Sequence, residues 1–401
     1  MKTASRLGAT ILLALTASAV LIAQTAPPPA QTTPPAQTAK TPAQTFSATV
    51  FMDYRFFLSD AGPITLKPTD PTVAYLSNQF VFRRAYFTYD NRINDHLSFR
   101  FRLDADNTAN VTGVGLINGQ PAATSTDNKL RPYIKNLYFE WSGFLLKDMT
   151  LRIGMESTLT FNIAEAKWGY RSVAKTVSDG FKDITGADNH ATSADIGASL
   201  QGSPLKFLNY GVQVTNGGGY AHPENNQWKK FAGQIQIIPV AGISVVGYID
   251  AERQQSQTNA LNLAKPMAYT YKVDAFFEMV KGLTIGGEWF NYRDDLYQAL
   301  NMATGTQEVY DLRGWSVFGH YTLVADKLNA FARYDSYVPN SLNSAKDIQL
   351  TILGLDWAPI HSSLKFQPNI WIYHYADGAL YNPNARSNTD LLFNMTFFLS
   401  F

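Results

Sequence analysis

The stretch HLSFRFRLDADN, residues 96–107, alternates between two kinds of side chain from one position to the next. The apolar set consists of Leu97, Phe99, Phe101, Leu103 and Ala105, and the polar set consists of Ser98, Arg100, Arg102, Asp104 and Asp106. Because successive side chains of a β-strand point to opposite faces, this period of two predicts a strand with one apolar and one charged face. Such a strand fits a soluble sandwich with its charged face in water, or a membrane barrel with its charged face in a pore.

Repetition of this pattern along the chain favours the barrel. We expect about sixteen strands, each near the roughly 9–11 residues that cross a bilayer at a tilt, at residues 46–58, 79–90, 96–107, 131–141, 148–156, 192–200, 207–215, 229–238, 242–252, 267–279, 282–292, 309–322, 327–337, 346–357, 363–374 and 389–401. Long connections such as 108–130, 157–191 and 293–308 alternate with short ones such as 91–95, 239–241 and 280–281. Long outer loops alternating with short turns are typical of outer-membrane proteins. The sequence therefore predicts an all-β fold, a transmembrane antiparallel β-barrel wide enough for an aqueous channel.

The composition agrees with a membrane barrel. Aromatic residues make up 13% of the chain and charged residues 16%, below the roughly 25% charged residues of an ordinary soluble domain. Mean hydropathy is nevertheless −0.15, because an apolar lipid face and a polar lumen offset each other. The 33 Lys and Arg nearly balance the 32 Asp and Glu, so no nucleic-acid partner is indicated.

Both ends of the chain carry features of an exported barrel. Lys2 and Arg6 precede an apolar run, Ile11 to Ala23, that is shorter than the roughly 20 residues of a spanning helix. We therefore expect residues 1–23 to be a secretory signal peptide, cleaved after Ala19 or Ala23. Residues 24–45, rich in Pro, Thr, Ala and Gln, should form a flexible periplasmic tail ahead of a barrel at residues 46–401. The last strand keeps its alternation of side-chain type up to Phe401. The chain contains no cysteine, so no disulfide holds the fold.

Parts of the chain resemble the phosphate-selective porin family, the O and P porins. These parts are residues 82–87 (FRRAYF) with 97–104 (LSFRFRLD), residues 151–155 (LRIGM) leading to 161–163 and Glu165, and residues 353–357 (LGLDW). The resemblance implies a homotrimeric, sixteen-stranded channel in the bacterial outer membrane, surrounded by its lipids. It also implies that Phe401 is part of the signal read by the outer-membrane assembly machinery. Phosphate selectivity does not carry over, because it needs ladders of basic residues and the inward faces here mix both signs.

The candidate channel residues are charged side chains on the predicted inward faces and in the longest connection. On the strands they are Arg83, Arg84, Arg100, Arg102, Asp104, Asp106, Arg152 and Glu156, and alternation leaves open which of Arg83 and Arg84 faces the pore. The resemblance implies that residues 157–191, the third long loop, fold into the lumen; an outward surface loop is the alternative. Inside, Phe161, Ile163, Trp168 and Tyr170 would anchor the loop, and Lys167, Arg171, Lys175 and Lys182 would line the channel opposite Asp104, Asp106 and Glu156.

These features favour a porin that passes small hydrophilic solutes or ions by passive diffusion, with anions such as phosphate among the candidates. The main alternative is a structural or adhesive barrel with a plugged lumen. A barrel phospholipase is a further alternative, but no convincing Ser–His pair occurs, so we expect no enzyme. We also expect no metal or cofactor, because the six histidines show no ligand spacing and the Asp104–Asn107 run lacks the glycine and distal Glu of a calcium loop.

Overall fold

The computed structural model describes residues 44–57, 78–106, 110–117, 120–127, 131–179, 192–220, 224, 226–254, 265–301, 304–376 and 388–401. The predicted signal peptide, residues 1–23, lies outside these ranges, as does most of the predicted tail, residues 24–45. Gln44 and Thr45 are the exception, since they already belong to the first strand. The barrel therefore begins slightly earlier than residue 46.

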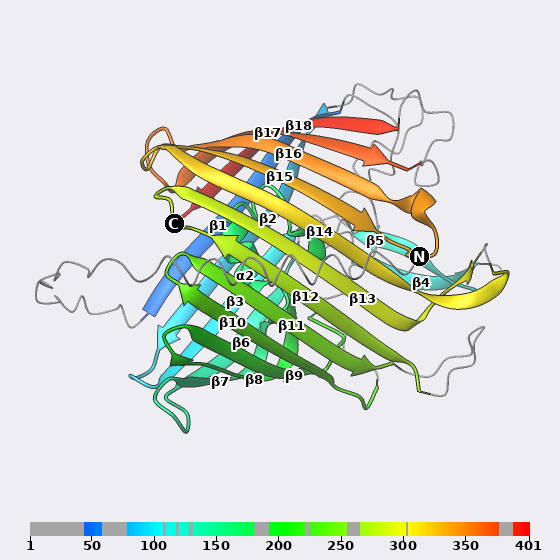
Figure 1. Ribbon diagram of the computed structural model, residues 1–401, viewed down its shortest axis with the longest axis horizontal. Helices are drawn as coiled ribbons and strands as arrows, with labels where there is room; N and C mark the ends of the chain where they lie inside the picture. Colours follow the sequence, from blue (N-terminus) through cyan, green and yellow to red (C-terminus); the bar gives the residue numbers. More distant parts are fainter. Residues whose placement is uncertain are drawn as a thin grey trace, which may run out of the picture. The chain divides into compact units, whose positions relative to one another are not determined.

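Sixteen strands form one closed antiparallel barrel (Figure 1). In chain order they are β1 (Gln44–Phe57), β2 (Asn78–Arg92), β3 (Leu97–Asp106), β6 (Pro132–Ser142), β7 (Met149–Ser157), β8 (Ala194–Leu205), β9 (Leu208–Thr215), β10 (Lys230–Val240), β11 (Ile243–Arg253), β12 (Met267–Phe277), β13 (Leu283–Asn301), β14 (Thr306–Val324), β15 (Leu328–Val338), β16 (Ile348–Trp357), β17 (Leu364–Tyr375) and β18 (Thr389–Ser400). The barrel closes where β1 pairs with β18, in a register that runs from Thr49↔Ser400 to Phe57↔Leu392. Closure leaves no free sheet edge, so the backbone groups of every strand can be paired within hydrocarbon. The predicted barrel of about sixteen strands is confirmed.

Several connections contain more regular structure than predicted. Residues 293–308 are not a long loop, because β13 and β14 continue through them and pair from Gln298↔Val309 to Asn301↔Thr306. Asp and Asn are common in turns, so Asp294, Asp295 and Asn301 make this part of the sequence resemble a loop. The predicted loop 108–130 contains a separate hairpin of β4 (Asn110–Ile117) and β5 (Gln120–Asp127), so β3 pairs next with β6.

Short helical elements also interrupt the connections. The predicted loop 157–191 contains helix α2 (Asn162–Trp168) and the 3-10 helix η1 (Val177–Asp179), and a second 3-10 helix, η2 (Ser344–Lys346), precedes β16. Within the described ranges, no helix is long and apolar enough to cross a membrane.

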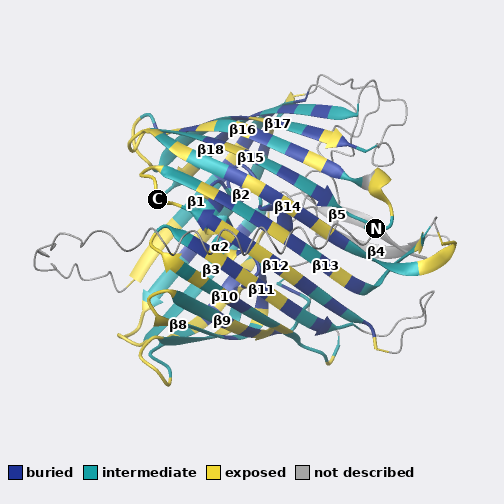
Figure 2. Ribbon diagram, in the orientation of Figure 1, coloured by how far each residue is buried: buried dark blue, intermediate teal, exposed yellow. Residues whose placement is uncertain are grey.

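The outward face of the barrel wall is apolar. Buried and exposed residues alternate along the strands (Figure 2). The exposed set is rich in large apolar side chains, including Trp141, Trp289, Trp315 and Trp357. Moving this apolar band from water into lipid lowers its free energy by roughly 25 cal/mol for each Å² removed from water. The chain is therefore a multi-pass transmembrane β-barrel of the kind that occupies bacterial outer membranes.

Tight turns join the strands at the end of the barrel that carries Phe401 (Figure 1). The turn between β10 and β11 shows why its residues suit it: Val240 pairs with Ile243, which leaves only Ala241 and Gly242 to reverse the chain. Gly242 has a φ of 86°, in the left-handed region that glycine enters without steric cost. A Cβ atom there would lie 3.1 Å from the backbone of Glu278.

Candidate functional site

Residues 158–179, here called the inner segment, lie inside the barrel. Their hydrogen bonds reach strands spread around its circumference: Gln234 of β10 to Leu159 O at 2.6 Å, Ser178 N to Glu288 of β13 at 3.0 Å, Ser172 Oγ to Gln367 of β17 at 2.7 Å, and Arg83 of β2 to Val173 O at 2.8 Å. A short segment can touch so many strands of a closed barrel only from within. The side chains that meet it therefore mark the inward face of the wall.

Trp168 is the largest anchor of the inner segment. Its side chain is completely buried, and its ring meets Phe318 and Phe331 edge-on at centroid distances of 5.4 and 5.9 Å. Its Nε1 donates to the Ala174 carbonyl at 3.0 Å. Gly169, with a φ of 73°, ends α2 directly after Trp168. The reversal lets the next residue, Tyr170, stack on the same Phe331 ring at 4.3 Å. Of the other predicted anchors, Phe161 is buried and Ile163 packs against this apolar cluster.

The basic residues of the inner segment form ion pairs close by. Arg171 lies 3.0 Å from Glu165 and 3.7 Å from Asp179, and Lys175 lies 4.0 Å from Asp179. Lys167 pairs with Glu278, in the turn after β12. Burial raises the pKa of the Glu165 carboxyl, although Arg171 acts in the opposite direction. Lys182, the fourth predicted residue, lies outside the described residues.

The ion pairs of the inner segment thus differ from the arrangement expected across the lumen. Asp104 and Asp106 are held instead by Arg84, at 3.5 and 3.2 Å, and both accept hydrogen bonds from the Tyr133 hydroxyl. Glu156 is buried and accepts a hydrogen bond from Ser199 Oγ at 2.7 Å. Arg171 and Asp179 nevertheless lie close enough to Arg84 and Lys135 to interact with them electrostatically.

A β-bulge places both Arg83 and Arg84 on the inward face. Phe51 of β1 pairs with Arg84, but the next residue, Met52, pairs with Phe82, so Arg83 is an extra residue in β2. A bulge of this kind lets two consecutive side chains point the same way. Arg84 binds the aspartates of β3, while Arg83 reaches Asp53 at 3.4 Å and the inner segment.

A second bulge produces a buried lysine that the sequence did not identify as a candidate. Arg102 pairs with Asn136 and Leu103 with Ile134, which makes Lys135 the extra residue of β6. Lys135 Nζ donates to Ser193 Oγ at 2.6 Å and lies 3.4 Å from the centre of the Tyr220 ring. The polar pair Lys135-Asn136 inside an otherwise alternating strand is the sequence signal that could have revealed it.

The remaining predicted residues follow β3 and β7 toward the short-turn end. Arg100 donates two hydrogen bonds to the Asp90 carboxylate, of 2.6 and 2.9 Å, and Arg152 forms an ion pair with Glu140 at 2.6 Å. Arg102 differs from them: its Nε donates to Thr88 Oγ1 at 2.9 Å and its guanidinium lies over the Tyr86 ring. This wall therefore presents matched ion pairs and one arginine bound to a hydroxyl.

The inward face of β13 to β18 is less polar than predicted. Phe290, Ile352, Trp371, Tyr373 and Leu392 all point inward and are buried in one apolar cluster with Trp168 and Val173. Alternation could not reveal this, because the neighbouring outward residues Ile370 and Ile372 are apolar as well. Ion pairs outside the predicted set of channel residues lie among these strands and β12: Lys272 with Asp274 and Glu288, Arg333 with Asp335, and Lys365 with Asp356.

In the described part of the chain, no group of three or more His, Asp or Glu side chains is arranged to hold a metal ion.

The fold is shared with known outer-membrane proteins of distant sequence. No protein-family model and no curated protein match the chain. Among solved structures, it is similar to Salmonella typhi OmpF in complex with daunomycin (TM-score 0.57, 10% identity, 89% of this chain and 97% of that chain). It is also similar to an anion-selective porin from Comamonas acidovorans (TM-score 0.56, 10% identity, 89% and 99%). A third is the trimer form of OmpT, an outer membrane protein of Vibrio cholerae (TM-score 0.52, 13% identity, 89% and 99%). At such low identity these similarities establish the fold, and the narrower resemblance to the phosphate-selective porins stays a prediction.

Proposed function

We propose that the chain is an outer-membrane porin, a water-filled channel through which small hydrophilic solutes and ions diffuse passively. The observation that carries the proposal is the inner segment, which packs against the apolar inward face of β13 to β17. It brings Arg171 and Asp179 near the charged wall of β2, β3 and β6. A barrel narrowed from one side and lined by charge on the other is suited to water and hydrated solutes. The proposal includes no enzymatic step and no cofactor.

The charges of the proposed channel favour weak ion selectivity. Arg84, Arg100, Arg152 and Arg171 each have a carboxylate within 4.0 Å, so each positive field is offset nearby. Rings of charge select strongly only when one sign dominates the narrowest point. Arg102 and Lys135, which form no ion pair with the carboxylates that the structure describes, give a modest preference for anions, and nothing in this arrangement singles out phosphate.

Planar-bilayer recordings of the purified full chain test the proposal. We expect stepwise insertions with a conductance that rises with bulk salt concentration, and a reversal potential close to zero in a salt gradient. A preparation that inserts without conducting would overturn the open pore. It would instead favour the plugged, adhesive barrel, for which the buried apolar cluster beneath β13 to β18 is the supporting observation.

The proposal extends to assembly. Phe401 exchanges backbone hydrogen bonds with Ala48, at 3.0 and 2.9 Å, while the residue as a whole is 74% exposed. The ring is thus accessible to the outer-membrane assembly machinery at the junction where β1 and β18 close the barrel. We propose a homotrimer exported through the signal peptide at residues 1–23. Native mass spectrometry of the extracted protein would distinguish a trimer from a monomer.

A further inference from the structure

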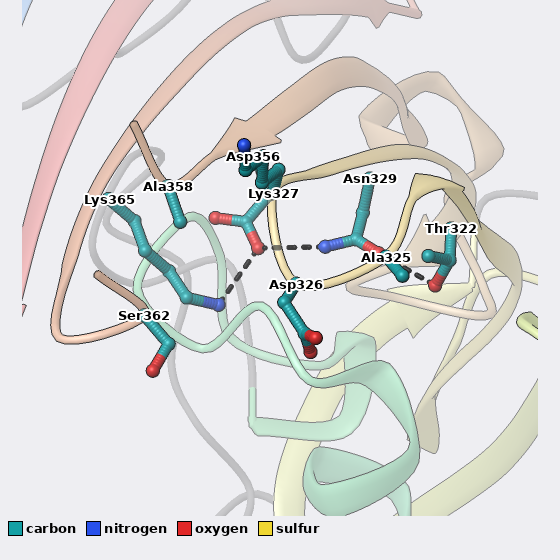
Figure 3. Close-up of a pocket in the computed structure, with 9 residues that line it drawn as sticks. All are labelled: Thr322, Ala325, Asp326, Lys327, Asn329, Asp356, Ala358, Ser362 and Lys365. Carbon is teal, nitrogen blue, oxygen red and sulfur yellow. Dashed lines mark hydrogen bonds and ion pairs between the residues drawn. The ribbon is translucent and has the colours of Figure 1, made fainter. Parts of the chain in front are cut away.

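A polar cavity of about 300 Å³ lies at the short-turn end of the barrel, between the turns that follow β14 and β16 (Figure 3). Asn329, Asp356 and Lys365 line it from the inward faces of β15, β16 and β17, and Asp326 and Lys327 line it from the β14–β15 turn. At roughly 30 Å³ for a water molecule in the liquid, the cavity has space for a small hydrated solute.

The floor of the cavity is fixed by a buried carboxylate. Asp356 is only 2% exposed, and its Oδ2 accepts from Lys365 Nζ at 2.9 Å and from Asn329 Nδ2 at 3.3 Å. Its Oδ1 accepts from Gln367 Nε2 at 3.0 Å. These three donors satisfy the carboxylate and hold the Lys365 ammonium in place. An ammonium has three N–H donors, so Lys365 keeps donors for a ligand.

The rim of the cavity carries one charge of each sign. Asp326 and Lys327 are consecutive, exposed residues of the turn, and among the described residues neither side chain has an ion-pair partner. Figure 3 shows the Lys365 ammonium directed at the Asp356 carboxylate, while the Asp326 carboxylate points away from it. Together, Lys327 and Lys365 balance Asp326 and Asp356, so the site has no net charge. A simple anion or cation would gain attraction from one sign and lose it to the other. A molecule that carries both charges can pair with both.

We propose that this cavity binds small zwitterions of the amino-acid type, with the carboxylate at Lys365 and Lys327 and the ammonium at Asp326. The inference rests on the proposed porin function and names a class of solute for it. The site lies where a solute leaves or enters the barrel at the short-turn end. Binding there is weak, because the contacts are solvent-exposed and a channel site must also release its ligand.

Saturation-transfer NMR on the full chain in detergent micelles tests the site without requiring conduction. L-serine is the probe, and its matched analogues are 3-hydroxypropionate, which lacks the ammonium, and ethanolamine, which lacks the carboxylate. We expect serine to bind about tenfold more tightly than either analogue, equivalent to about 1.4 kcal/mol. Equal affinities for all three would overturn the zwitterion site.

Variants at the rim assign the contacts. Asp326→Asn and Lys327→Gln should each weaken serine binding several-fold, because neither side chain supports the fold through an ion pair. Asp148→Asn and Lys206→Gln, in other short turns, are the matched controls and should leave binding unchanged. If the rim variants bind serine as the controls do, the site is refuted. A protein that binds serine but carries no current would refute the porin and leave the site standing. A protein that conducts but binds serine no better than its analogues would refute the zwitterion site and leave the porin function standing.

Discussion

Replacing Trp168 with alanine should release the inner segment while leaving the barrel closed. The ring is fully buried between Phe318 and Phe331, and its Nε1 holds the Ala174 carbonyl at 3.0 Å. Truncating a buried tryptophan costs about 3–5 kcal/mol. The backbone ladders that close the barrel do not include Trp168, so this loss falls on the docking of the segment. Because about 1.4 kcal/mol is a factor of ten, the undocked population should rise by roughly two to four orders of magnitude.

Single-channel recording is the assay for this change. If the inner segment narrows the channel, Trp168→Ala should raise the mean conductance and the open-channel noise, and a protease added to the chamber should cut within residues 158–179. Trp289→Ala is the matched control, since Trp289 is a lipid-facing residue of β13 that does not touch the segment's aromatic cluster. Heat-modifiable migration on gels should be unchanged for both variants. If Trp168→Ala keeps the conductance, noise and protease resistance of the wild type, Trp168 does not hold the inner segment in the channel.

Further predictions concern charge, acidity and assembly. Replacing Lys167, Arg171 and Lys175 together with glutamine leaves Glu278, Glu165 and Asp179 uncompensated, so the reversal potential should shift toward cations; no shift would place these residues away from the ion path. Burial raises the pKa of Glu165, so acidification should neutralise this carboxyl above the ordinary glutamate value of about 4.3. The reversal potential should then move toward anions as the pH falls through that raised value and return as it rises, and Glu165→Gln should abolish the step; persistence of the step in this variant would assign it to another group. Deleting Phe401 should lower the folded, heat-modifiable fraction in outer membranes, whereas a Phe401→Tyr control should keep it; equal levels for the deletion and the wild type would contradict a role in recognition.

Much of the candidate site could be anticipated from residue type and alternation. Arg100, Arg102, Asp104 and Arg152 were expected on the inward face, and their contacts with inward side chains of neighbouring strands agree with that orientation. Their partners could not be anticipated, because an ion pair across strands depends on register. Arg152 meets Glu140 because β6 pairs with β7 at those positions. Alternation also failed where it was interrupted, at the bulges that turn Arg83 and Lys135 inward.

The sequence by itself determined the closed sixteen-stranded barrel. Its strands repeat a period of two with one apolar face, and long and short connections alternate between them. Such strands are stable in a membrane only when each is paired on both edges and the apolar face meets lipid. The inner segment was decided by tertiary structure. The short helical elements around Trp168, Val173 and Val177 show no apolar alternation of their own, and these side chains are buried in a cluster with inward residues of distant strands, such as Phe331, Tyr337 and Trp371. Those strands come together only once the barrel has closed. The apolar half of the interior and the charged wall near Arg171 therefore follow from packing between residues far apart in sequence, which local pattern does not encode.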